Sequence, residues 1–400
     1  MGIYAWQHYF FLFLQKLSKM AQKPSIPKGT RDDTLLQLLE NYRLFIKRTH
    51  TAFLESKFKE CDDRLISDYT KYARLDSNYP RPILSFLGIN YQKDFEHCPD
   101  IEDLVDSNFI LIPQFVRDFL AIHDDIIDED TNKFGEDTLP MSLSRLQTPS
   151  TEHMTKVGND LALLHGDCII PIIYDIVCDS SLDAERKTAI ISRINNTLYY
   201  TNIGQIQELL MQQKLVENCS EMEIQDMYKI KAADYCYVFP FEIGVLYQGG
   251  NLYSPQIAQT HTILLEIGCV SQILDDLIGV FFETSGNQKN TLNELLFLRR
   301  SFLLKRTATR LDEDKILNGI LHKDYCDLDE ASYIKNLIIK RGVGEELVLS
   351  LMERCQHLKA QVNNLKIGSL CKAYFLYLID TRLEVNLKRF YVFFEQNKDK

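Results

Sequence analysis

Two clusters of aspartates, far apart in the chain, are the residues best suited to do chemistry. The first, Asp124-Asp125-Ile126-Ile127-Asp128, places Asp124 and Asp128 four residues apart. On a helix this spacing puts both carboxylates on one face, with Cβ atoms about 6 Å apart. The second, Asp275-Asp276, again follows a very apolar stretch. Carboxylates grouped in this way repel one another unless water or cations neutralise them.

Two acidic helix ends that face each other would form a site for hard cations. Mg²⁺ prefers oxygen ligands, keeps several waters, and usually binds one or two carboxylates together with substrate phosphates. Ca²⁺ takes more protein oxygens than this pattern offers. We therefore expect a diphosphate held between the two Asp-bearing helices through bridging Mg²⁺. A solvated helix end would explain one such cluster equally well, but it explains two less readily.

The segments that position these aspartates are predicted to be helices. The chain has only 17 Gly and 11 Pro in 400 residues, with no Pro after Pro255. Gly and Pro favour turns, and their scarcity excludes a many-stranded β fold. It predicts an all-α fold that forms one large helical bundle. Apolar residues recur at the helical intervals of three and four in segments 33–58, 108–128, 156–180, 185–216, 223–249, 256–283, 293–312, 330–341, 344–364 and 368–395.

Charge and cysteine usage exclude other classes of protein. The net charge is −11, without long runs of Lys or Arg, whereas nucleic-acid binding needs a basic surface. We therefore expect no nucleic-acid partner. The ten cysteines are scattered without metal-ligand spacing, which favours reduced thiols and a cytoplasmic protein.

Residues 1–31 are expected to be an N-terminal extension, and residues 32–400 one catalytic domain. The extension has no Asp or Glu, five Lys or Arg, and a short apolar run from Tyr9 to Leu14. That run is too short to span a bilayer, and we expect no transmembrane segment. Two interpretations stay open: the extension targets a mitochondrion or another organelle, or the protein starts at Met20.

These motifs resemble those of the trans-isoprenyl diphosphate synthases, or polyprenyl synthetases, which share their fold with class I terpene synthases. The resemblance covers about residues 33–390 and implies an isoprenoid synthase bundle that usually forms homodimers. Besides the two aspartate motifs, it rests on Arg81-Pro82, Gly135, Thr138, Gly166-Asp167, Gly204-Gln205 with Glu208, Lys231-Ala232-Ala233-Asp234-Tyr235, Val280-Phe281 and Lys289.

The resemblance also implies roles for individual residues. It implies three Mg²⁺ ions, held by Asp124, Asp125, Asp128 and Asp275 with support from Asp276. Its substrate-binding residues are Arg81, Lys133, Lys231, Lys289, Gln205, Gln272 and Phe119. Mg²⁺ and these cations would stabilise the charge that grows on a departing diphosphate. Lys133 replaces the first of two family arginines, which keeps the charge but loses the planar two-pronged contact.

A second half of the family reaction, condensation with isopentenyl diphosphate, needs another basic pocket. By resemblance its lysine is replaced here by Asn78, its His or Gln by Arg117, and its second arginine by Phe134; Arg81 remains. Losing one charge-assisted contact costs about 1.5–3 kcal/mol. We therefore expect this pocket to be damaged.

Three functions are consistent with this pattern. The one we favour from sequence is a terpene synthase that ionises an allylic diphosphate and cyclises or deprotonates the carbocation. The first alternative is a prenyltransferase that makes farnesyl or geranylgeranyl diphosphate. The second is a non-catalytic subunit that modulates an active homologue. In the family a bulky residue at the position of Phe119 limits chain length, so farnesyl diphosphate is the first substrate expected and geranylgeranyl diphosphate the second.

Overall fold

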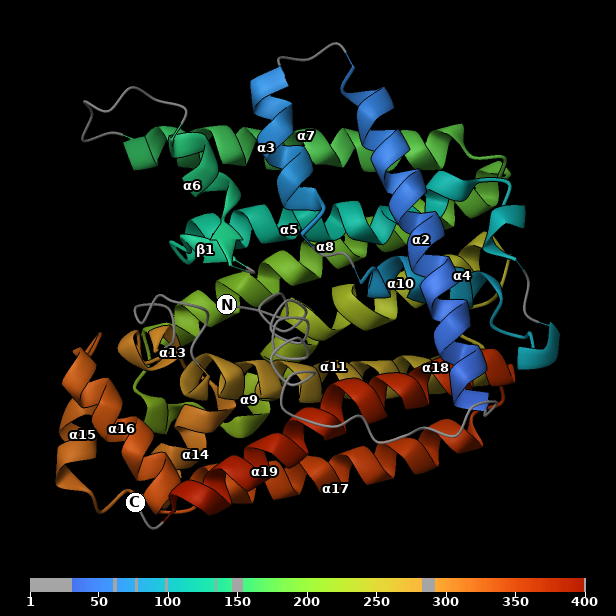
Figure 1. Cartoon of the computed structure of the whole chain (residues 1–400). Coiled ribbons are helices and arrows are strands. Elements are labelled where there is room, and N and C mark those ends of the chain that lie inside the picture. Colours follow the sequence, from blue (N-terminus) through green and yellow to red (C-terminus); the bar gives the residue numbers. More distant parts are fainter. Residues whose placement is uncertain are drawn as a thin grey trace.

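The computed structural model describes residues 31–59, 63–75, 78–97, 100–133, 135–145, 154–282 and 292–398. Within these ranges helices account for nearly all regular structure (Figure 1), which confirms the predicted all-α bundle. The exception is a short antiparallel pair, β1 (Asn132–Lys133) and β2 (Glu136–Asp137). Apart from Arg31, the predicted N-terminal extension lies outside the described residues.

The first half of the chain contains the helices that surround the first aspartate motif. They are α2 (Arg31–Lys57), α3 (Asp63–Ala73), α4 (Pro80–Ile89), α5 (Ile112–Ile127), α6 (Leu139–Ser144), α7 (Met154–Asp179) and α8 (Ala184–Gln212). Short 3₁₀ turns are η1 (Phe95–His97), η2 (Ile101–Asp103), η3 (Ser107–Leu111) and η4 (Val216–Asn218).

The second half supplies the other wall of the bundle. Its helices are α9 (Glu221–Tyr228), η5 (Lys229–Val238), α10 (Phe239–Tyr247), α11 (Pro255–Phe281), α13 (Asn293–Leu296), α14 (Phe302–Arg310), α15 (Lys315–Leu321), α16 (Leu328–Lys340), α17 (Val343–Asn364), α18 (Ser369–Leu378), η6 (Ile379–Glu384) and α19 (Val385–Asn397). Both η5 and η6 are π-helices.

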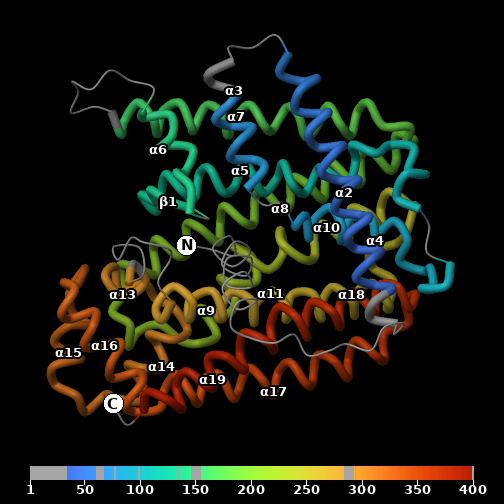
Figure 2. Tube along the Cα trace, viewed as in Figure 1, coloured from blue at the N-terminus to red at the C-terminus, as the bar shows by residue number. Residues whose placement is uncertain are grey.

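The layers of the bundle bring the two aspartate motifs to one end. In Figure 1, α7 and α5 lie on one side, α8 and α11 run through the middle, and α17 and α19 close the opposite side. The tube in Figure 2 shows that α5 and α11 both end toward the side of β1 and α13. Most residues of α11 are buried, so the second motif ends a core helix.

Two predicted boundaries differ from the structure. No helix is predicted between residues 58 and 108, yet α4 lies there and begins at Pro80, because proline is tolerated in the first turn of a helix. Its residue Gly88 lies against α10, where a Cβ would come within 2.0 Å of the carbonyl oxygen of Phe241. The segment predicted as one helix over 223–249 is divided into α9, the π-helix η5 and α10.

One described helix is long and apolar enough to cross a membrane by length and composition alone. It spans Thr155–Asp179, with mean hydropathy 1.7 and 39% of its apolar window buried. A helix that packs one face into a bundle meets the same test, and α7 packs against α5 and α6.

Candidate active site

The first aspartate motif presents two of its carboxylates to cations from the opposite wall. A carboxylate oxygen of Asp124 lies 3.7 Å from Nζ of Lys231, on η5. Nη1 of Arg299, just before α14, donates to Oδ2 of Asp128 at 3.0 Å. Asp124 and Asp128 therefore share one helix face, as their spacing predicts, and that face points across the bundle.

Asp125 points away from this face, although the resemblance implied a metal ligand there. Its buried carboxylate accepts hydrogen bonds from Tyr72 Oη at 3.0 Å and from Nζ of Lys133. Successive residues on a helix cannot share a face. Burial raises the pKa of Asp125 to about 6, against the lowering effect of Lys133. Lys133 was expected to bind substrate together with Lys231, but in the structure it pairs with the buried carboxylate of Asp125.

The second motif contains a carboxylate without a hydrogen-bond partner. Asp275 is 3% exposed, and neither of its oxygens makes a hydrogen bond with any described residue. Burial, together with the charges of Asp276 and Glu294, raises its pKa well above the ordinary value. Asp276, in contrast, accepts from Tyr228 Oη and from Gln272 Nε2, the latter at 3.2 Å.

The donor set fits Mg²⁺ bound together with a diphosphate. A buried, unpartnered carboxylate is costly unless a proton or a cation neutralises it. Among the described residues no three His, Cys, Asp or Glu side chains converge closely enough to hold a metal on their own. Mg²⁺ binds a few carboxylates together with water and phosphate oxygens, and the carboxylates of Asp124, Asp128 and Asp275 would suit it.

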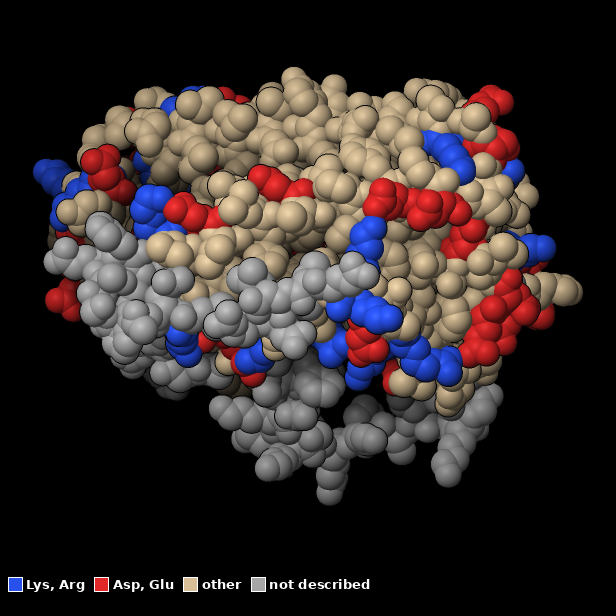
Figure 3. Space-filling view, turned by 90° about the horizontal axis from the view of Figure 1, so that it is seen from above, with Lys and Arg blue, Asp and Glu red and all other residues tan. Residues whose placement is uncertain are grey.

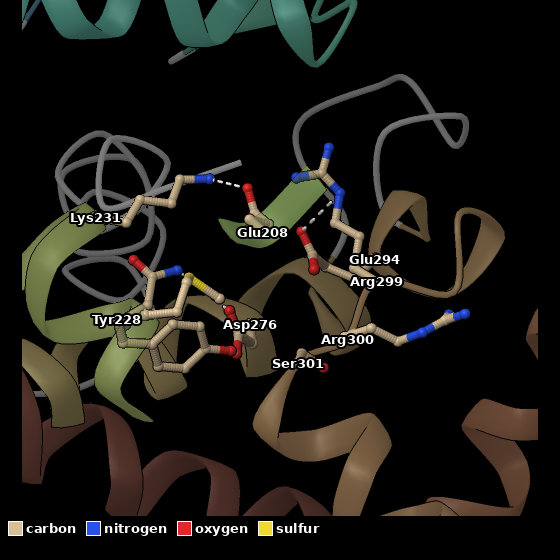
Figure 4. A pocket seen from close by; sticks show the side chains of 10 residues that line it. Glu208, Tyr228, Lys231, Asp276, Glu294, Arg299, Arg300 and Ser301 are labelled. Atoms are coloured by element: carbon tan, nitrogen blue, oxygen red, sulfur yellow. Dashed lines mark hydrogen bonds and ion pairs between the residues drawn. The ribbon is translucent and has the colours of Figure 1, made fainter. Parts of the chain in front are cut away.

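Two ion pairs lie near Asp276 of the second motif (Figure 4). Lys231 Nζ donates to Glu208, and Arg299 lies 3.9 Å from Glu294. Burial alone would lower the pKa of Lys231, but the charges of Glu208 and Asp124 outweigh it and raise that pKa. Both cations therefore stay charged and are held in place before substrate binds.

Two cavities meet at Lys231 and Gln272. One is mainly polar and is lined by Glu208, Met227, Tyr228, Lys231, Gln272, Asp276, Glu294, Arg299, Arg300 and Ser301. The other has more apolar walls and is lined by Leu120, His123, Asp124, Ile127, Thr201, Asn202, Gln205, Lys231, Ala232, Tyr235 and Gln272. Such a pair can hold a charged head group beside an apolar chain.

Gln205 is among the residues that line the second cavity, whereas Phe119 is not. Gln205 lines it, and its buried Nε2 makes no hydrogen bond with a described residue. The ring of Phe119 packs on His123 at 4.4 Å between centroids, and His123 Nδ1 lies 2.8 Å from the carbonyl oxygen of Phe119. In α5, Leu120 lines the cavity one turn before Asp124.

Two residues assigned to the second basic pocket, Arg81 and Arg117, have protein partners. Arg81 is buried, donates to Cys236 Sγ at 2.8 Å and lies over the ring of Tyr235. Arg117, also buried, pairs with Asp118 at 2.8 Å. Phe134 and Lys289 lie outside the described residues.

Sequence reasoning missed Arg299, Arg300 and Glu294. All three line the polar cavity. The available signal was the adjacent pair Arg299-Arg300 inside the apolar run from Leu295 to Leu304, because two buried arginines require acidic partners or a bound anion.

The helical bundle has the fold of the isoprenoid synthases. Among solved structures, a geranylgeranyl pyrophosphate synthase from Corynebacterium glutamicum, complexed with isoprenyl diphosphate and magnesium, matches with TM-score 0.74 and 20% identity, over 86% of this chain and 99% of that one. A decaprenyl diphosphate synthase from Rhodobacter capsulatus matches with TM-score 0.67 and 16% identity, over 89% and 98%. Identities this low establish the fold alone.

The sequence itself matches the polyprenyl synthetase family over residues 80–338. The chain belongs to this family, which confirms the resemblance drawn from the motifs. Comparison with curated protein sequences returns no match.

Proposed function

We propose that this protein is a Mg²⁺-dependent prenyltransferase that joins an allylic prenyl diphosphate to isopentenyl diphosphate. The observation that supports it best is the polar cavity lined by Lys231, Arg299 and Asp276. Asp276 follows Asp275, a buried carboxylate that makes no hydrogen bond with a described residue. Membership of the polyprenyl synthetase family favours this function over the terpene synthase expected from sequence. Structural neighbours named as geranylgeranyl and decaprenyl synthases support the same choice.

In the proposed reaction the residues of the polar cavity promote departure of diphosphate. The C1–O bond of the allylic substrate breaks, and its electron pair leaves with the diphosphate. Lys231 and Arg299 stabilise the charge that develops on the leaving oxygens. Asp124, Asp128 and Asp275 would hold Mg²⁺, which when bound supplies further neutralisation. A new carbon–carbon bond then forms from the isopentenyl double bond, and the departed diphosphate accepts the proton that the product loses.

The apolar cavity would hold the allylic chain. Its walls include Leu120, Ile127 and Tyr235, and an aromatic face can stabilise a nearby cation. The product we propose is farnesyl or geranylgeranyl diphosphate, so the allylic substrate is geranyl or farnesyl diphosphate.

A terpene synthase is the second candidate, because the second basic pocket has few cations available to bind isopentenyl diphosphate. Arg81 and Arg117 are buried against Cys236 and Asp118, and Asn78 has no charge. An enzyme that binds isopentenyl diphosphate weakly would let the allylic cation cyclise or lose a proton. A non-catalytic subunit is a weaker candidate, because it has no need for a buried charged site.

One assay separates these functions. Purified protein is incubated with Mg²⁺ and geranyl, farnesyl or geranylgeranyl diphosphate, each with and without isopentenyl diphosphate, and products are identified by mass spectrometry. Longer prenols that appear only with isopentenyl diphosphate support the prenyltransferase. Hydrocarbons or terpene alcohols formed without it support the terpene synthase, and no turnover under either condition supports the subunit.

We also propose that the protein is a homodimer, and that α7 and α8 supply the contact. These neighbouring helices expose large apolar side chains at Leu163, Leu164, Tyr199, Tyr200, Ile206, Leu209 and Leu210. Seen from above, the side on which α7 lies, the surface includes a wide area with few charged residues (Figure 3). Exposed apolar area on this scale is typical of a protein interface.

A further inference from the structure

The segment that contains Lys231 has an unusual backbone. The ten residues Lys229–Val238 form the π-helix η5. π-helices occur mostly as single turns inside α-helices, often at functional sites. A longer one needs support from contacts outside its own hydrogen bonds, and η5 is wedged between α8 and α11.

One contact fixes η5 closely at Lys231 itself. A Cβ added to Gly204 of α8 would come within 2.7 Å of the backbone nitrogen of Lys231. The two backbones therefore touch at this point, which leaves little room for the start of η5 to move toward α8.

A second contact ties the middle of η5 to α8 through a buried ion pair. Arg193 grips Asp234 with two nitrogens, Nη2 to Oδ1 at 2.6 Å and Nη1 to Oδ2 at 3.2 Å. Thr197, one turn further along α8, donates to the same carboxylate at 2.9 Å. The side chains of Arg193 and Asp234 are 12% and 16% exposed. Two-pronged pairs of this kind fix direction as well as distance.

The same arginine reaches the next two helices. Its Nε donates to Glu242 of α10 at 2.6 Å, and Glu242 in turn pairs with His261 of α11 at 2.8 Å. Arg193 thus connects α8, η5, α10 and, through Glu242, α11. Three of these elements also supply Gln205, Lys231 and Gln272 to the cavities.

We propose that the Arg193–Asp234 ion pair is a clamp that aims Lys231 at the diphosphate site, so that Arg193, Thr197 and Asp234 are positioning residues. Asp234 lies three residues after Lys231, about one turn away. A shift of η5 along α8 would move Nζ of Lys231 away from Asp124 and Glu208. Misplacement of a binding group by about 1 Å can cost about 100-fold in rate. The inference rests on the proposed function, because it assigns Lys231 to a diphosphate.

The test is a double-mutant cycle with binding as the readout. Calorimetry measures the Kd of inorganic pyrophosphate with Mg²⁺ for wild type, Asp234→Asn, Lys231→Ala and the double variant. If Asp234 acts through Lys231, Asp234→Asn weakens binding about 10-fold in the wild type and has no further effect beside Lys231→Ala. Equal weakening in both backgrounds, or none in either, overturns the clamp.

Two further variants keep the test decisive. Thr197→Val removes the hydrogen bonds of this hydroxyl with Asp234 and with Arg193 while leaving the ion pair. It takes the place of Asp234→Asn in the cycle if that variant does not fold. The matched control is Lys359→Met, which breaks the pair of Lys359 with the buried Glu384 on the other π-helix, η6. We expect it to lower Tm and to leave the Kd of pyrophosphate unchanged; an equal loss of binding would overturn the clamp. Wild-type protein that does not bind Mg²⁺ and pyrophosphate contradicts the proposed function itself.

Discussion

Arg299 Nη1 lies 3.0 Å from Oδ2 of Asp128, so two residues 171 positions apart in the chain form an ion pair at the end of the bundle where the two aspartate motifs lie. Each outer aspartate of the first motif thus meets a cation from the opposite wall, Asp124 through Lys231 and Asp128 through Arg299. Asp124 and Asp128 would hold Mg²⁺, and Lys231 and Arg299 would then be available to bind the diphosphate oxygens.

Replacing Arg299 tests this arrangement. We expect Arg299→Met to lower kcat/KM by about 100-fold or more, since the loss of one preorganised charge at a leaving group costs on that order. Steady-state kinetics with the allylic diphosphate measures the effect. Arg310→Met, which removes a well-exposed pair with Glu346, is the control and should keep wild-type kcat/KM. A fully active Arg299→Met would remove Arg299 from the site.

Replacing Asp275 should separate activity from stability. Asp275→Asn should abolish turnover, because it removes a proposed metal ligand. It should also stabilise the metal-free protein by about 1–3 kcal/mol, since it replaces a buried unpartnered carboxylate by a neutral group of the same shape. Thermal unfolding with a chelator present measures the change in Tm. A lower Tm for Asp275→Asn would contradict the assignment of an unpartnered charge at this position.

The difference in the free energy of unfolding between Asp275→Asn and the wild type should depend on pH. The folded-state pKa of Asp275 is raised well above its ordinary value, which is about 3.9 in an unfolded chain. Between these two pKa values the folded state retains a proton that the unfolded state has lost, so the free energy of unfolding of the wild type falls as pH rises. Asn cannot titrate. The stability advantage of Asp275→Asn should therefore be small near pH 4 and grow with pH, as measured by denaturant unfolding with a chelator present at several pH values. An advantage independent of pH would contradict the raised pKa.

The two neighbouring aspartates of the first motif should behave differently. Asp124 faces the cavity, whereas Asp125 is buried against Tyr72 and Lys133. We expect Asp124→Asn to weaken Mg²⁺-dependent pyrophosphate binding about 100-fold, and Asp125→Asn by less than 10-fold with a clear loss of Tm. Calorimetry and thermal unfolding of both variants make the comparison. If both variants lose the same affinity for pyrophosphate, Asp125 is a metal ligand like Asp124.

A charge on the exposed face of α7 should disrupt the proposed dimer. Leu164 is 59% exposed, and Leu164→Glu would place a carboxylate in an apolar contact. Light scattering after size exclusion should then report a monomer where the wild type gives a dimer. Leu349→Glu, at an exposed apolar position of α17, is the control and should remain dimeric. A wild-type monomer would contradict the proposal.

Local patterns in the chain were enough to predict the helical bundle and the two aspartate motifs. A period of three to four apolar residues, scarce Gly and Pro, and aspartates at i and i+4 are short-range features, and the structure confirms the fold they predict. Errors arose where the apolar period carries no signal for an element. The helix α4 begins at Pro80 in a stretch without a predicted helix, and the period over 223–249 does not distinguish the π-helix η5 from the α-helices on either side.

Only the tertiary structure decided which charges meet. Asp124 and Asp125 are adjacent and chemically identical, yet one faces the cavity and the other a buried lysine, because helix rotation and packing separate them. The pairs of Asp128 with Arg299, and of Arg193 with Asp234, join residues distant in sequence. Electrostatic interactions depend on distance and burial in three dimensions, and neither quantity can be read from the spacing of residues along the chain.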